Sequence, residues 1–132
     1  MENFDKNEIK ETAEKHGIRM VVLFGSRANR SAKTDSDFDV AYISEKKLNL
    51  EEESKFAFDL SKIFKSENID MVNLREAKPL LMKQIAENSL ILYEKEHSLF
   101  NEFFIYATKI YNESRILFKI REDYLNKKIA SY

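Results

Sequence analysis

Two short polar segments, each next to an apolar run, hold the residues of this sequence whose types and spacing could do chemistry. Gly25 and Ser26 directly follow the apolar run 18–24, and Asp37 and Asp39 stand at the start of the next one. A glycine at the end of a strand lets the backbone approach a phosphate group closely. Backbone N–H groups and the Ser26 hydroxyl can then bond phosphate oxygens, so Gly25 and Ser26 are candidates for a phosphate-binding turn.

Asp37 and Asp39 are two residues apart, which places both carboxylates on the same face of a strand. Two neighbouring carboxylates repel each other unless a cation lies between them. Magnesium is commonly held by one or two carboxylates together with the phosphates of a substrate. The two segments together therefore predict a site for a nucleoside triphosphate with bound metal.

Each segment alone also has a simpler interpretation. Solvated loops carry many Asp-x-Asp pairs, and a Gly-Ser dipeptide usually marks a turn. Here one of only two glycines closes an apolar run, a serine follows it, and the acidic pair opens the next apolar run. This conjunction favours a site over a coincidence.

The pattern of Gly25-Ser26, ten further residues, and then Asp37-Phe38-Asp39 resembles the signature of the DNA polymerase beta-like nucleotidyltransferases. Within that superfamily the short chain is similar to the minimal nucleotidyltransferases, the MntA-like antitoxins that pair with HEPN-domain toxins. The resemblance covers the chain from Ile18 through its C-terminal helix. It implies an α+β nucleotidyltransferase fold, with a small mixed sheet flanked by helices and a long C-terminal helix.

The resemblance also implies roles for individual residues. Gly25 and Ser26 would hold the triphosphate, and Asp37 and Asp39 would bind the metal ions. The family has a third carboxylate on a following strand, and Asp70 is the matching candidate because it opens an apolar run as Asp37 does. Asp70 would bind the catalytic metal and help to deprotonate the incoming hydroxyl, although an aspartate at a strand start can also be a simple turn residue.

Three basic residues lie in or next to the segment between the two motifs. Arg27 follows Ser26 directly, as in many family members, and could contact a phosphate. A surface arginine paired with an acidic neighbour is an equal alternative for Arg27. Arg30 and Lys33 could add positive charge near the phosphates, but the simpler expectation is that both are solvated.

The reaction implied by the resemblance is transfer of AMP from ATP to a hydroxyl of a HEPN ribonuclease toxin, a tyrosine hydroxyl, with two Mg²⁺ ions. ATP is inferred from the family alone. One alternative is a non-catalytic antitoxin that masks its toxin by binding. Another is a small-molecule adenylyltransferase of the aminoglycoside-modifying kind, although such enzymes usually carry an additional substrate-binding domain.

The spacing of hydrophobic residues predicts the helices and strands that must position these residues. The sequence has only two glycines and one proline, so few residues interrupt these elements. Gly17 marks a helix end, and Asn49 with Glu52 three residues later forms a capping box. Pro79 suits the first turn of a helix. The pattern predicts helices over 7–16, 50–65, 78–87 and 96–128, and strands over 18–24, 38–43, 69–74 and 90–93.

The last predicted helix carries an apolar stripe at steps of three or four residues, from Phe100 to Leu125. Such a helix is about 50 Å long, whereas a domain of this size has a radius of gyration of about 14 Å. We therefore expect a nucleotidyltransferase core over 1–95 and a helix over 96–132 that packs on the core and then extends to a partner. The stripe through Ala107 should be core, and the stripe from Tyr111 to Leu125 should be a protein interface. The partner implied by the family is the HEPN toxin, and self-association through this helix is equally consistent with the stripe.

Composition narrows the classes of protein that remain. The chain has 132 residues, with 22 Lys and Arg against 23 Asp and Glu, so its net charge of -1 argues against binding nucleic acid through bulk charge. It has no cysteine and only two histidines, which excludes a disulfide scaffold or a thiolate metal site. The segment 1–10 does not have the pattern of a signal peptide, and unbroken apolar stretches such as 20–24 are far too short to span a membrane. We therefore expect a cytoplasmic protein with no membrane partner.

Overall fold

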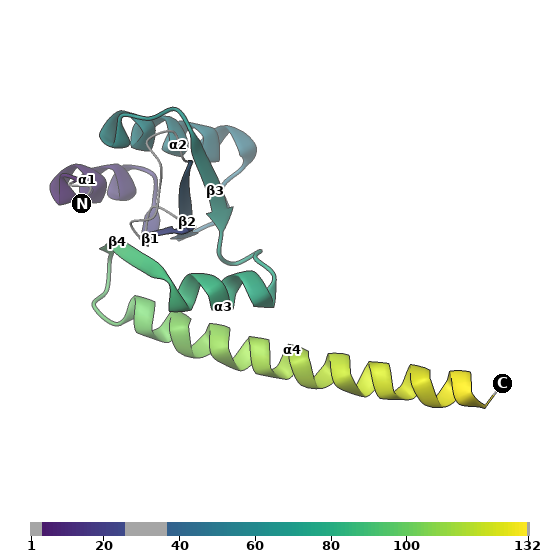
Figure 1. Ribbon diagram of the computed structural model, residues 1–132. Helices are drawn as coiled ribbons and strands as arrows, with labels where there is room; N and C mark the ends of the chain where they lie inside the picture. Colours follow the sequence, from purple (N-terminus) through teal and green to yellow (C-terminus); the bar gives the residue numbers. More distant parts are fainter. Residues whose placement is uncertain (1–3, 26–36, 132) are drawn as a thin grey trace.

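The computed structural model describes residues 4–25 and 37–131 (Figure 1). It contains all eight elements that the sequence pattern predicts, and their ends differ from the predicted ones by three residues at most. In chain order they are α1 (Lys6–Lys15), β1 (Ile18–Phe24), β2 (Phe38–Ser44), α2 (Leu50–Phe64), β3 (Ile69–Asn73), α3 (Pro79–Glu87), β4 (Ser89–Glu94) and α4 (Leu99–Ala130).

The four strands form one mixed sheet in the order β3-β2-β1-β4. Strand β1 runs antiparallel to β2 and to β4, whereas β2 and β3 are parallel. The parallel pair is joined by α2, which follows β2 and returns the chain to the end of the sheet where β2 began. The predicted α+β fold with a small mixed sheet is therefore confirmed.

Helices cover both faces of the sheet and create two hydrophobic clusters. On one face, α1 and α2 bury Ile9 and Phe56 against strand residues such as Val40. On the other face, α3 and α4 bury Ile85 and Phe103 against residues such as Ala41. Because neighbouring residues of a strand point to opposite faces, β2 contributes alternately to the two clusters.

Local signals in the sequence explain most of the helix ends. The Asn49 side chain accepts a hydrogen bond from the Glu52 N–H, and the Glu52 side chain accepts one from the Asn49 N–H, so the predicted capping box is present. Gly17 follows α1 with φ of +66°. Helix α2 ends instead at Lys65, a non-glycine residue with φ of +56°, which no turn signal in the sequence predicted.

Helix α4 packs on the core only through its first turns and then projects away from the rest of the molecule (Figure 1). Leu99, Phe103 and Ala107 are buried, and every residue from 112 to 131 is exposed. The prediction that the whole stripe through Ala107 belongs to the core was wrong for Phe104, which is 39% exposed. Leu99, Phe103 and Ala107 follow one another at four-residue steps and meet α3, while Phe104 lies a further 100° or so around the helix.

Within the described ranges 4–25 and 37–131, the helices are either too short or too polar to cross a membrane.

Candidate functional site

The candidate site lies at the end of the sheet where β1 stops and where β2 and β3 begin. Asp39, the second residue of β2, is paired with Phe24 of β1 on one side and with Asp70 of β3 on the other. Paired residues on adjacent strands direct their side chains to the same face of a sheet. Asp39 and Asp70 therefore share the face covered by α3 and α4, and Asp37 lies just before β2.

The three carboxylates influence one another electrostatically. Burial raises the pKa of the Asp39 carboxyl above its usual value, and the neighbouring charges of Asp70 and then Asp37 raise this pKa further. Asp39 is half-buried, whereas Asp37 and Asp70 are exposed. The ionised form of Asp39 is therefore less favourable than that of a free aspartate, and a nearby cation would offset this cost.

The carboxylate set suits a hard divalent cation that keeps other oxygen ligands. Within residues 4–25 and 37–131, no three His, Cys, Asp or Glu side chains are placed so that they could hold a metal ion by themselves. Aspartate oxygens are nevertheless of the type that Mg²⁺ binds, and substrate phosphates are its usual further ligands. This donor chemistry fits the metal that the sequence motif implies.

Gly25 has a structural role that its position in the sequence did not reveal. Its φ is +73°, and a Cβ atom built at this position would collide with the carboxylate of Asp39. The missing side chain therefore allows the Asp39 carboxylate to lie directly against the chain at the end of β1. A glycine is required here for its backbone conformation and also for the position of the central acidic residue.

The structure brings four of the predicted site residues to one end of the sheet: Gly25, Asp37, Asp39 and Asp70. The other predicted residues, Ser26 and Arg27 together with Arg30 and Lys33, lie outside the described residues. The predicted roles of all these residues in binding phosphate or metal stay predictions.

Sequence reasoning missed one polar residue in the same row of the sheet. Ser89, the first residue of β4, is paired with Phe24, which in turn is paired with Asp39. Its Oγ atom is buried and has no hydrogen-bond partner within residues 4–25 and 37–131. A serine at a strand start carries no distinctive signal, so only the strand register could place it beside the site.

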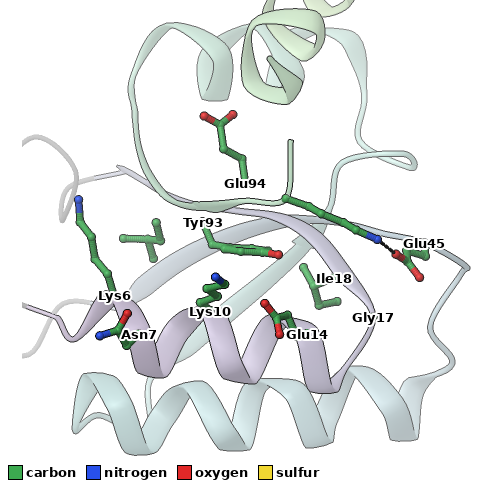
Figure 2. A pocket seen from close by; sticks show the side chains of 11 residues that line it. Lys6, Asn7, Lys10, Glu14, Gly17, Ile18, Glu45, Tyr93 and Glu94 are labelled. Atoms are coloured by element: carbon green, nitrogen blue, oxygen red, sulfur yellow. Dashed lines mark hydrogen bonds and ion pairs between the residues drawn. The ribbon is translucent and has the colours of Figure 1, made fainter. Parts of the chain in front are cut away.

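A separate pocket of about 630 Å³ opens between α1 and the end of β4 (Figure 2). The Tyr93 ring lies in the middle of this pocket, between side chains of α1 and the Glu45–Lys95 ion pair, whose charged atoms are 2.5 Å apart. Burial and the nearby Glu14 carboxylate raise the pKa of the Tyr93 hydroxyl. None of the candidate carboxylates lines this pocket, so its position does not suit the predicted chemistry.

Comparison with known proteins agrees with this geometry. The family described as polymerase beta, nucleotidyltransferase matches residues 7–98, which include the sheet and the candidate carboxylates. The chain is also 38% identical over 95 residues to the protein adenylyltransferase MntA of Aphanizomenon flos-aquae (strain 2012/KM1/D3). That alignment covers 65% of this chain and 63% of the relative, so the chain spans less than two thirds of the relative's length.

Solved structures with similar folds include antitoxin complexes. One is described as a toxin-antitoxin with AMP-PNP, and it has a TM-score of 0.75 and 20% identity over 92% of this chain and 98% of that chain. Another is described as a tri-AMPylated Shewanella oneidensis HEPN toxin in complex with an MNT antitoxin, with a TM-score of 0.68 and 20% identity over 91% and 94%. At these identities the similarity is one of fold, and it extends over α4 as well as the sheet.

Proposed function

The chain belongs to the polymerase beta nucleotidyltransferase family, and from this premise we propose that it transfers AMP from ATP to a hydroxyl of a HEPN-domain toxin. The proposed acceptor is a tyrosine, and the modification would neutralise the toxin. The observation that carries the proposal is the position of Asp39. Its carboxylate lies against Gly25, and Asp39 is paired with Asp70 on the neighbouring strand. The name of the MntA relative and the AMPylated toxin in a structure of similar fold support the choice of reaction and partner.

Asp37, Asp39 and Asp70 would hold two Mg²⁺ ions in this proposal. Such ions stabilise the charge that develops on the attacking and leaving oxygens of a phosphoryl group. The raised pKa of Asp39 supports the assignment, because a carboxylate crowded by two others gains most from a neighbouring cation.

The remaining steps would be carried by Asp70 and by the residues at the end of β1. An Asp70 carboxylate oxygen would accept the proton of the acceptor hydroxyl, and its exposed position leaves it accessible to an incoming side chain. The backbone at Gly25 and the Ser26 hydroxyl would hold the triphosphate, with Arg27 contacting a phosphate. In this scheme the hydroxyl oxygen attacks the α-phosphorus of ATP and pyrophosphate leaves.

The exposed half of α4 supports a role for a protein partner. Residues 112–131 are all exposed, and several of them have large apolar side chains. Exposed apolar surface of this kind marks a protein interface. In the proposed reaction that partner supplies the acceptor hydroxyl.

The test is to incubate the purified chain with ATP, Mg²⁺ and the protein encoded by the adjacent gene, and to measure the partner's intact mass. A gain of one or more AMP units is expected for the wild-type chain, and no gain is expected for Asp39→Ala. An Asp39→Ala variant that transfers AMP at the wild-type rate would contradict the assignment. A stable complex with no mass gain would favour inhibition by binding alone, which the exposed face of α4 also allows.

A further inference from the structure

The projecting part of α4 has two apolar seams rather than one. Seam one consists of Tyr111, Phe118 and Leu125, and seam two consists of Ile110, Leu117, Ile120 and Tyr124. Phe118 and Leu117 are each 67% exposed, and Ile120 and Tyr124 are each 60% exposed. Ile110 and Tyr111 are half-buried next to the core, whereas the members of both seams from residue 112 onward are exposed at the same level of the helix.

The spacing within each seam is that of helix-to-helix packing. Seam one repeats every seven residues, and seam two follows the alternating steps of seven, three and four residues that are typical of heptad patterns. At 3.6 residues per turn the two seams lie roughly a third of a turn apart. One neighbouring helix packs along one seam of this kind, so covering both seams requires two helices.

A column of polar residues runs along α4 between the two seams, on the side where the seams lie nearer to each other. It consists of Ser114, Arg121 and Lys128, at seven-residue spacing. All three are exposed, and Arg121 forms no ion pair with any residue in the described part of the chain. Two helices seated on the seams would therefore flank a column with two positive charges, and acidic side chains from those helices would complement it.

The beginning of seam one coincides with the end of the contact between α3 and α4. A cleft of about 870 Å³ lies there, lined by Leu80 of α3 and by residues of α4 that include Tyr111 and Phe118. Leu80, at the start of α3, is 55% exposed. A partner helix on seam one would enter this cleft and would cover Leu80.

We propose that α4 inserts into a groove between two helices of its toxin partner, one helix on each seam, with acidic side chains of that partner facing Arg121 and Lys128. This inference rests on the proposed function only in taking a helical toxin as the partner. Beyond the proposed function, it states that the partner supplies two helices and that acidic side chains lie between them.

The first test places a photo-crosslinking phenylalanine analogue at one of three positions in the full chain. Phe118 reports on seam one, Tyr124 reports on seam two, and exposed Asn126 on the polar side of α4 is the control. After irradiation with the protein encoded by the adjacent gene, positions 118 and 124 should attach to two different helices of that protein, and position 126 should attach to neither. Attachment of 118 and 124 to the same helix, or to a second copy of this chain, would overturn the inference.

The second test measures the affinity for the same protein by calorimetry. Arg121→Glu should weaken binding at least tenfold, whereas Asp123→Lys, a charge reversal at an exposed residue on the side of α4 away from both seams, should change it less than twofold. Equal effects of the two substitutions would overturn the charged groove. The Asp39→Ala variant separates this inference from the proposed function, because it should lose AMP transfer but keep both crosslinks. If the wild-type chain forms both crosslinks but transfers no AMP, only the proposed function is rejected.

Discussion

At the scale of single residues, Asp39 combines a stability cost with a predicted catalytic role. Its raised folded-state pKa means that the folded chain binds the Asp39 proton more tightly than the unfolded chain does. The ionised carboxylate therefore destabilises the metal-free fold once the pH rises through that raised pKa. We predict that Asp39→Asn increases the Tm of the metal-free protein at neutral pH and abolishes AMP transfer, measured by thermal unfolding in EDTA and by mass spectrometry.

The pH dependence and a control check the sign of this prediction. The difference in Tm between Asp39→Asn and wild type should shrink as the pH falls below the raised pKa, because Asp39 is then neutral as well. Asp59 is the matched control, since hydrogen bonds from His16 and then Lys15 lower the pKa of its carboxyl, against a smaller opposing effect of burial. Asp59→Asn should decrease the Tm at neutral pH and leave AMP transfer intact; an increase would contradict this electrostatic account.

The two glycines allow the contact at the site to be separated from backbone strain. Gly17 and Gly25 both have positive φ, but a Cβ at Gly17 would meet no atom within 4 Å, whereas one at Gly25 would meet Asp39. Gly17→Ala should cost about 1–2 kcal/mol of stability and leave AMP transfer unchanged. Gly25→Ala should cost at least as much and reduce transfer strongly. Denaturant unfolding and transfer rates, measured on both variants, check the comparison, and a fully active Gly25→Ala would disprove the role of the Gly25–Asp39 contact.

At the scale of elements, the sequence was sufficient wherever a boundary depends on a local interaction. Gly17, the Asn49–Glu52 box and Pro79 each act within a few residues of the chain, so the helix ends they mark were predictable. The end of α2 at Lys65 was predictable only from the end of its apolar spacing. The left-handed conformation of Lys65 itself follows no local residue preference.

The candidate site was predictable only in its motifs. The sequence identified Gly25, Asp37 and Asp39 by residue type and spacing, and Asp70 through the family resemblance. It could not show that Asp70 pairs with Asp39 or that Ser89 belongs to the same row, because register depends on how strands far apart in the chain align. It also could not show that the Asp39 carboxylate occupies the space left by the missing side chain of Gly25.

The capping box provides a test at this scale. The Asn49 side chain accepts the Glu52 N–H at 2.8 Å, so Asn49→Ala should lower the free energy of unfolding by about 1 kcal/mol. Ser98, the N-cap of α4, is the matched control because its side chain makes no capping hydrogen bond. Ser98→Ala should change stability by only a few tenths of a kcal/mol. Equal losses in chemical denaturation would show that the cap of α2 contributes nothing specific.

At the scale of the whole molecule, the fold separates a compact part from a projecting helix. The sheet, α1 to α3 and the first turns of α4 share two hydrophobic clusters, and Ala107 is the last residue of α4 within them. Residues 112–131 are exposed throughout. The predicted boundary between a core over 1–95 and a helix over 96–132 therefore stays a prediction. The buried residues favour a folding unit that includes the start of α4.

Deleting residues 112–132 should consequently leave the fold intact while removing the proposed partner interface. Folding stability comes mainly from burial of apolar surface, and residues 112–131 of the deleted segment are all exposed. The free energy of unfolding of the truncated chain should remain within about 0.5 kcal/mol of the wild-type value, the range typical of surface changes. Its complex with the protein encoded by the adjacent gene should be lost in size-exclusion chromatography.

A chain shortened further to residues 1–95 should unfold, because it lacks Leu99, Phe103 and Ala107, which pack against α3 and the sheet. A stable 1–95 fragment would instead place the boundary before α4, and a complex that survives the first truncation would show that the partner binds elsewhere.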